Sequence, residues 1–172
     1  MVLNLESRRR IYETIEKNPG IHFRELLKIL NMNTGELQYH LNVLIKNNLI
    51  SEKEIDNLKV YFPIKMPNQM MKTVLSYLRN SITKRIIINI AMNPGITLIG
   101  LYSMMNTSKK TLINNLTKLK ERKIIREICE EKECRYYLYD EELIINTLTT
   151  YRESLFDELV GKFMEFMERN RK

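Results

Sequence analysis

The sequence contains one long segment twice. Asn18-Pro19-Gly20-Ile21 returns 75 residues later as Asn93-Pro94-Gly95-Ile96, and at this offset residues 11–62 align with residues 86–137 without a gap. The identical positions are mostly apolar, and they include the pairs Ile11/Ile86, Ile15/Ile90, Leu26/Leu101, Leu41/Leu116, Leu44/Leu119 and Tyr61/Tyr136. A repeat of this length indicates one small domain used twice, so the chain is not expected to fold as one large unit.

Each copy predicts the same order of elements. A first helix must end at Asn-Pro-Gly, because proline cannot continue the helical hydrogen bonds. A short strand, two helices separated by a tight turn, and a hairpin follow, which is the winged helix-turn-helix order. The expected fold class is therefore mainly α with small β-hairpins (α+β). The expected parts are a first winged-helix domain over 1–66, a linker helix over 67–80, a second winged-helix domain over 81–139 and one long C-terminal helix over 140–172.

The positive charge is concentrated in the second copy. The chain carries 28 Lys and Arg against 21 Asp and Glu, a net charge of +7. Residues 67–128 hold eleven basic and two acidic side chains, whereas residues 129–172 hold seven basic and eleven acidic ones. This distribution is compatible with a polyanionic partner without establishing one.

Several classes of protein are not expected. No signal peptide is evident, and apolar runs such as Ile86–Ile88 are too short for a membrane span, so we expect a cytoplasmic protein with no membrane partner. No glycine-rich phosphate loop or nucleophile motif occurs, so no enzyme, catalytic residue or cofactor is expected. His22 and His40 lie in different elements and predict no metal site, and His40 is expected to be a packed, hydrogen-bonded histidine at the edge of the core. Cys129 and Cys134 flank a hairpin tip, and we expect reduced, unpaired thiols there, with a redox switch as the alternative.

The third helix of the first copy, over 34–47, has two different faces. Leu37, Leu41 and Leu44 form a stripe for the core, and the N-terminal cap is either Asn33 or Thr34. Amide side chains on the opposite face can pair with adenine. The predicted DNA contacts are Thr34, Gly35, Gln38, Tyr39, Asn42 and Lys46. The alternative is an ordinary solvated face.

The third helix of the second copy, over 108–122, is more basic. Lysines suit phosphate contacts, which position a protein without reading the sequence. The predicted contacts are Ser108, Lys109, Lys110, Asn114, Thr117 and Lys118. The tips of both hairpins are acidic, so we expect weak contacts there, limited to single phosphate contacts by Lys59, Lys132 and Arg135. A solvated basic face is again the alternative.

The run Thr34-Gly35-Glu36-Leu37-Gln38-Tyr39-His40-Leu41-Asn42-Val43-Leu44, closed by Asn48-Leu49-Ile50, resembles the recognition helix of ArsR/MarR-type winged-helix regulators, in particular archaeal ones with a Tyr-His-Leu core. The resemblance implies a sequence-specific regulator of transcription that binds double-stranded DNA. Tandem regulators of this build include activators, and activation and repression both stay open. It also implies a homodimer through the C-terminal helix, although that helix is equally suited to packing within its own chain. The cysteine pattern of metal-sensing members is absent from residues 23–30.

A function of another class fits the same sequence. Winged helices also serve as protein-interaction adaptors in larger transcription or nucleic-acid complexes, where the transcription machinery is the partner. The acidic hairpin tips and the apolar stripe of the last helix would suit that role. RNA is a third option, weakened because no aromatic stacking platform is evident.

Overall fold

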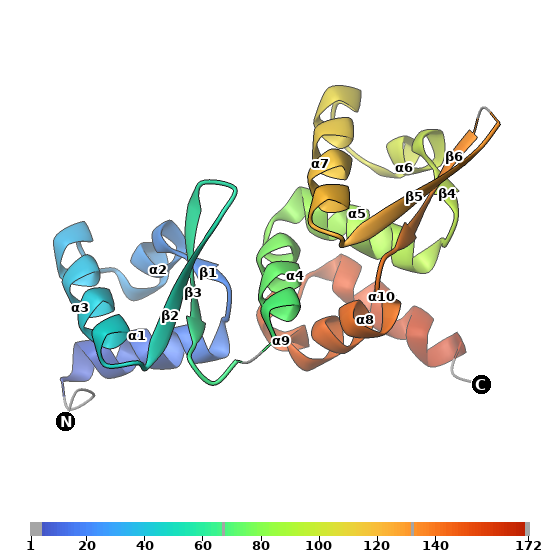
Figure 1. Cartoon of the computed structure of the whole chain (residues 1–172). Coiled ribbons are helices and arrows are strands. Elements are labelled where there is room, and N and C mark those ends of the chain that lie inside the picture. The colour runs from blue at the N-terminus through green and yellow to red at the C-terminus, as the bar shows by residue number, and fades with distance from the viewer. Residues whose placement is uncertain (1–4, 67, 132, 171–172) are drawn as a thin grey trace. The chain divides into compact units, whose positions relative to one another are not determined.

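The computed structural model describes residues 5–66, 68–131 and 133–170 (Figure 1). Lys132, one of the predicted phosphate contacts, lies outside these residues, as does Pro67 of the predicted linker. Contacts between residues divide the chain into two compact units, Met1–Ser76 and Tyr77–Lys172. Each unit is described here by itself.

The first unit combines helices with a small antiparallel sheet. In chain order it contains α1 (Glu6–Lys17), β1 (Ile21–His22), α2 (Phe23–Leu30), α3 (Thr34–Lys46), β2 (Ile50–Ile55) and β3 (Leu58–Pro63). The strand order is β1-β3-β2, so β3 pairs with both of the other strands. The hairpin of β2 and β3 is the wing of the first unit.

A glycine turn joins α1 to the sheet, and it recurs in the second unit. Gly20 and Gly95 adopt positive φ angles of 81° and 83°, which residues with a side chain rarely adopt. The Gly20 N–H donates to the carbonyl of Tyr61 at 2.8 Å, and the Gly95 N–H donates to the carbonyl of Tyr136 at 2.9 Å. In both units, this bond holds the end of the first helix against the central strand.

The core of the first unit lies between α1 and α3. Leu37, Leu41 and Leu44 on α3 are fully buried in one cluster with Ile11 and Ile15 on α1. Burial of each such side chain contributes about 1.5–3 kcal/mol. The leucine stripe therefore fixes which face of α3 points outward.

Polar side chains cap the helix-turn-helix elements at equivalent positions of the two copies. His22 and Asn33 cap α2 and α3, and Thr97 and Ser108 cap the corresponding helices of the second unit. Each side chain accepts the backbone N–H three residues later, at 3.2, 2.8, 3.2 and 3.1 Å in that order. The cap of α3 is thus Asn33 and not Thr34, and His22 has a structural role that the sequence analysis did not assign.

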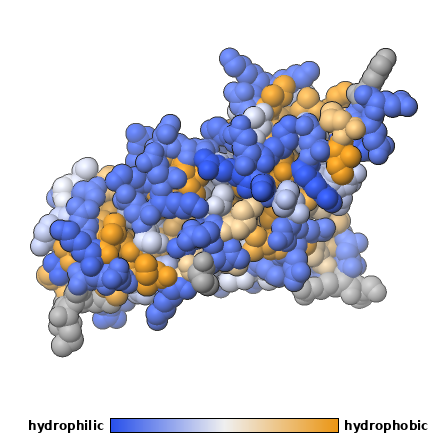
Figure 2. Space-filling view, in the orientation of Figure 1, coloured by the Kyte–Doolittle hydropathy of each residue, from blue (hydrophilic) through white to orange (hydrophobic). Residues whose placement is uncertain are grey.

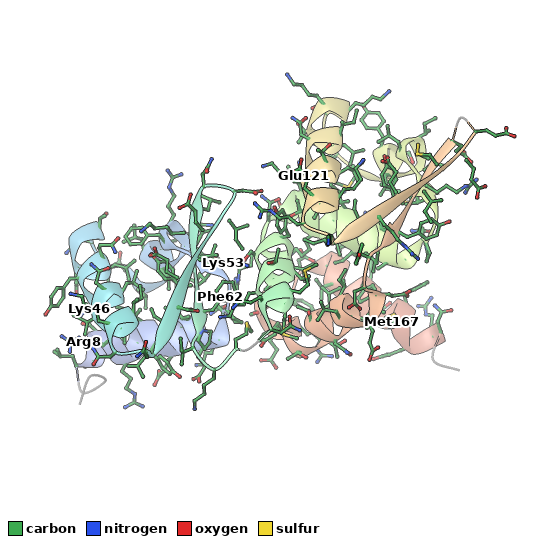
Figure 3. All side chains as sticks on the ribbon, in the orientation of Figure 1. Arg8, Lys46, Lys53, Phe62, Glu121 and Met167 are labelled. Atoms are coloured by element: carbon green, nitrogen blue, oxygen red, sulfur yellow. A yellow bond between two sulfur atoms is a disulfide. The ribbon has the colours of Figure 1, made fainter. Side chains whose placement is uncertain are left out.

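The helix α4 (Gln69–Arg79) forms where the sequence predicts a linker helix. Its first half packs on the wing of the first unit, and Lys53 and Phe62 of the wing point toward α4 (Figure 3). Lys53 Nζ donates to Thr73 Oγ1 at 3.0 Å, and Lys72 Nζ lies 5.4 Å from the centroid of the Phe62 ring. Burial lowers the pKa of Lys72. These contacts attach the start of α4 to the first unit.

The second unit repeats the order of the first and adds a C-terminal segment. Its elements are α5 (Ser81–Met92), β4 (Ile96–Thr97), α6 (Leu98–Met104), α7 (Lys109–Glu121), β5 (Ile125–Glu130), β6 (Glu133–Leu138), α8 (Glu141–Thr150), α9 (Arg152–Leu155) and α10 (Glu158–Asn170). Its strand order, β4-β6-β5, matches that of the first unit. The hairpin of β5 and β6 is the wing of the second unit.

The prediction of a single C-terminal helix is wrong, because the chain breaks between α8, α9 and α10. Asp157 Oδ1 accepts the N–H of Val160 at 3.0 Å and so starts α10 afresh. The buried Lys84 of α5 donates to the carbonyl of Leu155 at 3.1 Å and pairs with Asp157 Oδ2 at 2.5 Å. Burial by itself would raise the pKa of Asp157, but the hydrogen bonds from Lys84 and from backbone N–H groups of α10, together with the charge of Lys84, outweigh it and the pKa is lowered. The break is therefore fixed by a lysine on a distant helix.

The predicted fold class, α+β with small hairpins, is confirmed by these helices and sheets. Among the described residues, no helix combines the length and the apolar character needed to cross a membrane.

The Lys84–Asp157 pair should contribute measurably to stability. Asp157→Asn keeps the oxygen that caps α10 and removes the charge that compensates the buried ammonium. We expect the free energy of unfolding to fall by about 2 kcal/mol, below the usual cost of breaking a buried pair because Asp157 is partly exposed. Urea unfolding measures the change. Glu165→Gln, at an exposed pair with Arg169, serves as the control and should change stability by less than about 0.5 kcal/mol. Equal effects of the two substitutions would contradict the prediction.

Candidate nucleic-acid interface

The outward face of α3 brings together the six predicted contacts of the first unit. Five of them are exposed, namely Thr34, Gly35, Tyr39, Asn42 and Lys46, and Gln38 is half-buried. Gln38 Nε2 donates to Asn42 Oδ1 at 3.0 Å. This bond orients the two amides side by side and leaves the Gln38 carbonyl oxygen and the Asn42 amino group for other partners. An acceptor next to a donor matches the edge of adenine in the major groove.

Tyr39 is the most prominent aromatic side chain on this face, with 58% of its surface exposed. The guanidinium of Arg8 lies 6.0 Å from the centroid of its ring, and the ring of His40 lies edge-on at 5.2 Å. Figure 3 labels Arg8 on α1 and Lys46 on α3, in the same unit. His40 is buried as predicted, but its Nδ1 has no hydrogen-bond partner among the described residues.

The outward face of α7 presents the predicted contacts of the second unit. All of them are exposed, namely Ser108, Lys109, Lys110, Asn114, Thr117 and Lys118. Hydrophilic residues cover the start of α7 at the top of Figure 2. Ser108 already caps the helix, and Thr117 Oγ1 donates to the carbonyl of Ile113 at 3.1 Å. Lys109, Lys110 and Asn114 are therefore the side chains best placed for a partner.

Ile113 also lies on this face and was not among the predicted contacts. It is 42% exposed, and at the offset of the repeat it occupies the position of Gln38. An exposed apolar side chain among lysines and amides can contact the methyl group of thymine. Alignment of the two copies is the sequence signal that identifies this position.

Both wings carry internal ion pairs that involve the predicted phosphate contacts. Lys59 Nζ lies 2.9 Å from Glu52 Oε1, and an Arg135 amino group lies 2.5 Å from Glu133 Oε2. Arg135 also donates to the carbonyl of Gly95 at 3.2 Å. The positive charge of both residues is thus partly used within the wing.

A carboxylate joins the second wing to α7. Glu127 Oε2 accepts from Lys120 Nζ at 2.5 Å, and this hydrogen bond lowers the pKa of Glu127. Burial and the nearby Glu127 carboxylate raise the pKa of Tyr136 far above its usual value. In the first unit, burial and Glu52 act in the same way on Tyr61. The two copies therefore share a buried tyrosine beside a wing carboxylate.

The prediction of unpaired thiols is wrong, because Cys129 and Cys134 form a disulfide. The register of β5 and β6 places the two residues directly opposite each other on one face of the hairpin, so the sulfurs meet across the strands. Donor atoms of Glu127, Cys129 and Cys134 lie within 4.8 Å of one another. Two of these three donors are used by the disulfide, so in this form the group is not a metal site.

Comparison with known proteins matches the first unit to a family. Residues 5–74 match the family model HTH_HVO_0163_N, an N-terminal HTH domain. The first unit is a helix-turn-helix domain. The expectation that the chain is not an enzyme agrees with this match.

Two further proteins resemble the chain. A protein of Methanocaldococcus jannaschii named "Uncharacterized HTH-type transcriptional regulator MJ1398" is 36% identical over 137 residues, which cover 80% of this chain. The chain spans about a third of that relative, since the match covers 34% of its length. A solved structure of a SlyA-like transcription regulator from Listeria monocytogenes covers 70% of this chain and 72% of its own, with 22% identity and a TM-score of 0.35.

Both units should lose stability at alkaline pH. Tyr61 and Tyr136 have raised pKa values when folded, whereas unfolded tyrosines lose their protons near pH 10. Above that pH the folded state holds more protons, so the free energy of unfolding falls by up to about 1.4 kcal/mol per pH unit for each tyrosine. Urea unfolding between about pH 9 and pH 11 should show a shallower fall for Tyr136→Phe than for the wild type.

A matched control separates this effect from other alkaline titrations. Tyr139→Phe replaces an exposed tyrosine and should follow the wild-type pH dependence. Lys72 acts with the opposite sign, because its lowered pKa favours the folded state as pH rises, and its contribution cancels in the comparison between variants. Parallel curves for Tyr136→Phe and the wild type would refute the assignment.

Proposed function

We propose that the chain is a sequence-specific transcription regulator that binds double-stranded DNA through two tandem winged-helix domains, in the cytoplasm. The domains cover 1–66 and 81–139, with the linker helix over 67–80 and the C-terminal segment over 140–172. The family match over residues 5–74, together with the amide-bearing outward face of α3, is the observation that carries the proposal. Activation is the mode that the resemblance to archaeal regulators suggests.

In this proposal α3 enters a major groove with its N-terminal half. The Gln38–Asn42 amide pair contacts the edge of an adenine, and Tyr39 contacts a neighbouring base or sugar. Lys46, near the end of the helix, contacts a phosphate. The Asn33 cap and the leucine stripe hold the helix in the orientation that these contacts require.

The second unit supplies more of the phosphate attraction. Lys109, Lys110 and Lys118 are exposed on α7, and residues 67–128 carry a larger net positive charge than the chain as a whole. Asn114 and Ile113 contact base edges, the latter through a thymine methyl group. The two units therefore recognise different base sequences, and a DNA site bound by both units is not a direct repeat of one sequence.

DNA binding should depend on the two helices in different ways. Gln38→Ala with Asn42→Ala should cost about 1–3 kcal/mol at the selected target and little on random duplex, because bidentate base contacts are lost. Lys109→Glu with Lys110→Glu should weaken binding to every duplex and flatten the dependence of log affinity on log salt by about two or more. Selection from a random duplex library, followed by fluorescence anisotropy at several salt concentrations, measures both effects.

The control substitution is Lys17→Glu, at an exposed position near the end of α1 and outside both outward faces. It should lower affinity only slightly, through net charge. Absence of binding to any duplex even at low salt would overturn the proposal.

An adaptor that binds a protein of the transcription machinery is the second candidate. It is favoured by exposed apolar side chains on α6, where Ile99 is 81%, Tyr102 45% and Met104 45% exposed. Ile99→Lys should abolish binding by an apolar partner and leave the lysine-dependent attraction to DNA in place. Lys109→Glu with Lys110→Glu should instead weaken DNA binding and leave binding of an apolar partner unchanged.

A homodimer through the C-terminal segment is part of the proposal. Phe156 is 67% exposed and borders a shallow, mostly apolar hollow of about 480 Å³, also lined by Arg152, Glu153, Gly161 and Met164. The patch contains both a projecting ring and a hollow, and both a cation and an anion. Such a surface is self-complementary, as a two-fold symmetric interface requires.

Phe156→Glu should convert the dimer to a monomer, because a charge would be buried at the centre of the contact. Light scattering coupled to size-exclusion chromatography, over a range of concentrations, measures the mass. Arg152→Glu should weaken the dimer, and adding Glu153→Arg should restore it, since the exchange keeps both charges in the patch. A wild-type mass of one chain at all concentrations would refute the homodimer and leave DNA binding by a monomer open to its own test.

A further inference from the structure

The chain's two cysteines occupy both members of one cross-strand pair. Cys129 on β5 lies opposite Cys134 on β6, next to the last pair of the wing. At the offset of the repeat, the same pair in the first wing is Glu54 opposite Lys59, an ordinary pair of opposite charges. In the first wing Lys59 forms its ion pair with Glu52, whereas in the second wing a covalent bond joins the two strands at this position.

The disulfide is open to reagents in solution. Cys129 is exposed and Cys134 is half-buried. The bond closes a loop of only four intervening residues, so its loss removes little conformational restriction from the unfolded chain. The antiparallel ladder from Ile125 opposite Leu138 to Ile128 opposite Arg135 does not depend on it. Opening the bond therefore affects the tip of the wing and not the fold of the unit.

The disulfide closes an acidic hairpin tip on the wing that the Glu127–Lys120 contact joins to α7. Glu130, Glu131 and Glu133 lie between the two cysteines, and within the described part of the chain Glu133 pairs with Arg135 in a contact that is itself part of the wing. On the same face, Glu127 precedes Cys129 by two residues and binds Lys120 of α7. The bridge thus limits how far these carboxylates can turn away from a polyanion that contacts α7.

We propose that Cys129 and Cys134 form a reversible thiol–disulfide exchange site, and that its oxidised form weakens DNA binding by the second unit. The effect on DNA rests on the proposed function, whereas the exchange site itself does not. The co-reactant is a dithiol in one direction and its disulfide in the other. Reduction releases the tip, so that its carboxylates can move away from phosphate.

The exchange proceeds in two balanced steps. A thiolate of the dithiol attacks the exposed Cys129 sulfur, a mixed disulfide forms, and Cys134 leaves as a thiolate that takes up a proton. The second thiolate of the reagent then attacks its own sulfur in the mixed disulfide and releases Cys129, which is protonated in turn. Two electrons pass from the dithiol to the protein, and the reagent leaves as a cyclic disulfide.

The first test is redox equilibration of the full chain in buffers of reduced and oxidised dithiothreitol. Mass spectrometry after thiol alkylation should show one intramolecular bridge that opens and closes reversibly. Cys129→Ser with Cys134→Ser should be inert. Failure of the bridge to form within one chain, or formation of linked dimers in its place, would overturn the exchange site.

The second test compares DNA affinity of the two forms on the same duplex. The reduced form should bind about 3- to 10-fold more tightly at low salt, and the difference should shrink as salt screens the carboxylates. The double serine variant should match the reduced form in either buffer. Equal affinities, or tighter binding by the oxidised form, would overturn the effect on DNA. Reversible bridging with no DNA binding in either form would instead refute the proposed function and leave the exchange site standing.

Discussion

The structure of each unit depends on one hydrogen bond at the Asn-Pro-Gly turn. The N–H of Gly20 or Gly95 reaches the carbonyl of the central strand only because the glycine adopts a positive φ angle after the proline has ended the helix. This bond places the short strand β1 or β4 on the free edge of the hairpin. The second helix begins at the next residue, so its direction is set by the same turn. The cap of the third helix and the leucine stripe then complete an arrangement that the turn has already oriented.

On this shared frame the two units present different chemistry. The buried stripes of α3 and α7 are leucines at equivalent positions, whereas the outward faces differ at almost every residue. Gln38 is replaced by Ile113, Tyr39 by Asn114 and Asn42 by Thr117. Packing constrains the inward face because a cavity or an unpaired polar group would cost several kcal/mol. The outward face carries no such packing constraint, so its residues can differ between the two units without a cost in stability.

The elements of both units could be predicted from the sequence because local rules decide them. Proline and glycine end the first helices, and apolar residues at helical spacing mark the core of α3 and α7. Features that depend on distant residues could not be predicted. The contacts of Lys84 with Leu155 and Asp157 fix the break in the C-terminal segment, and no local sequence pattern predicts them. Predicting the disulfide requires the register of the hairpin, because a shift of one residue would move Cys129 away from its position opposite Cys134. The outward residues of both recognition helices were identified from helical spacing, and their contacts with DNA stay a prediction.

The buried Lys84 has a consequence for how the chain is made. Translation proceeds from the N-terminus, and domains generally fold as units as they emerge from the ribosome. The first unit has all of its buried residues once Leu75 has been synthesised. The second unit must wait much longer, because the ammonium group on α5 meets its carbonyl acceptor 71 residues later. During that interval α5 lacks the packing that α10 later provides, so the second unit completes its core later than the first.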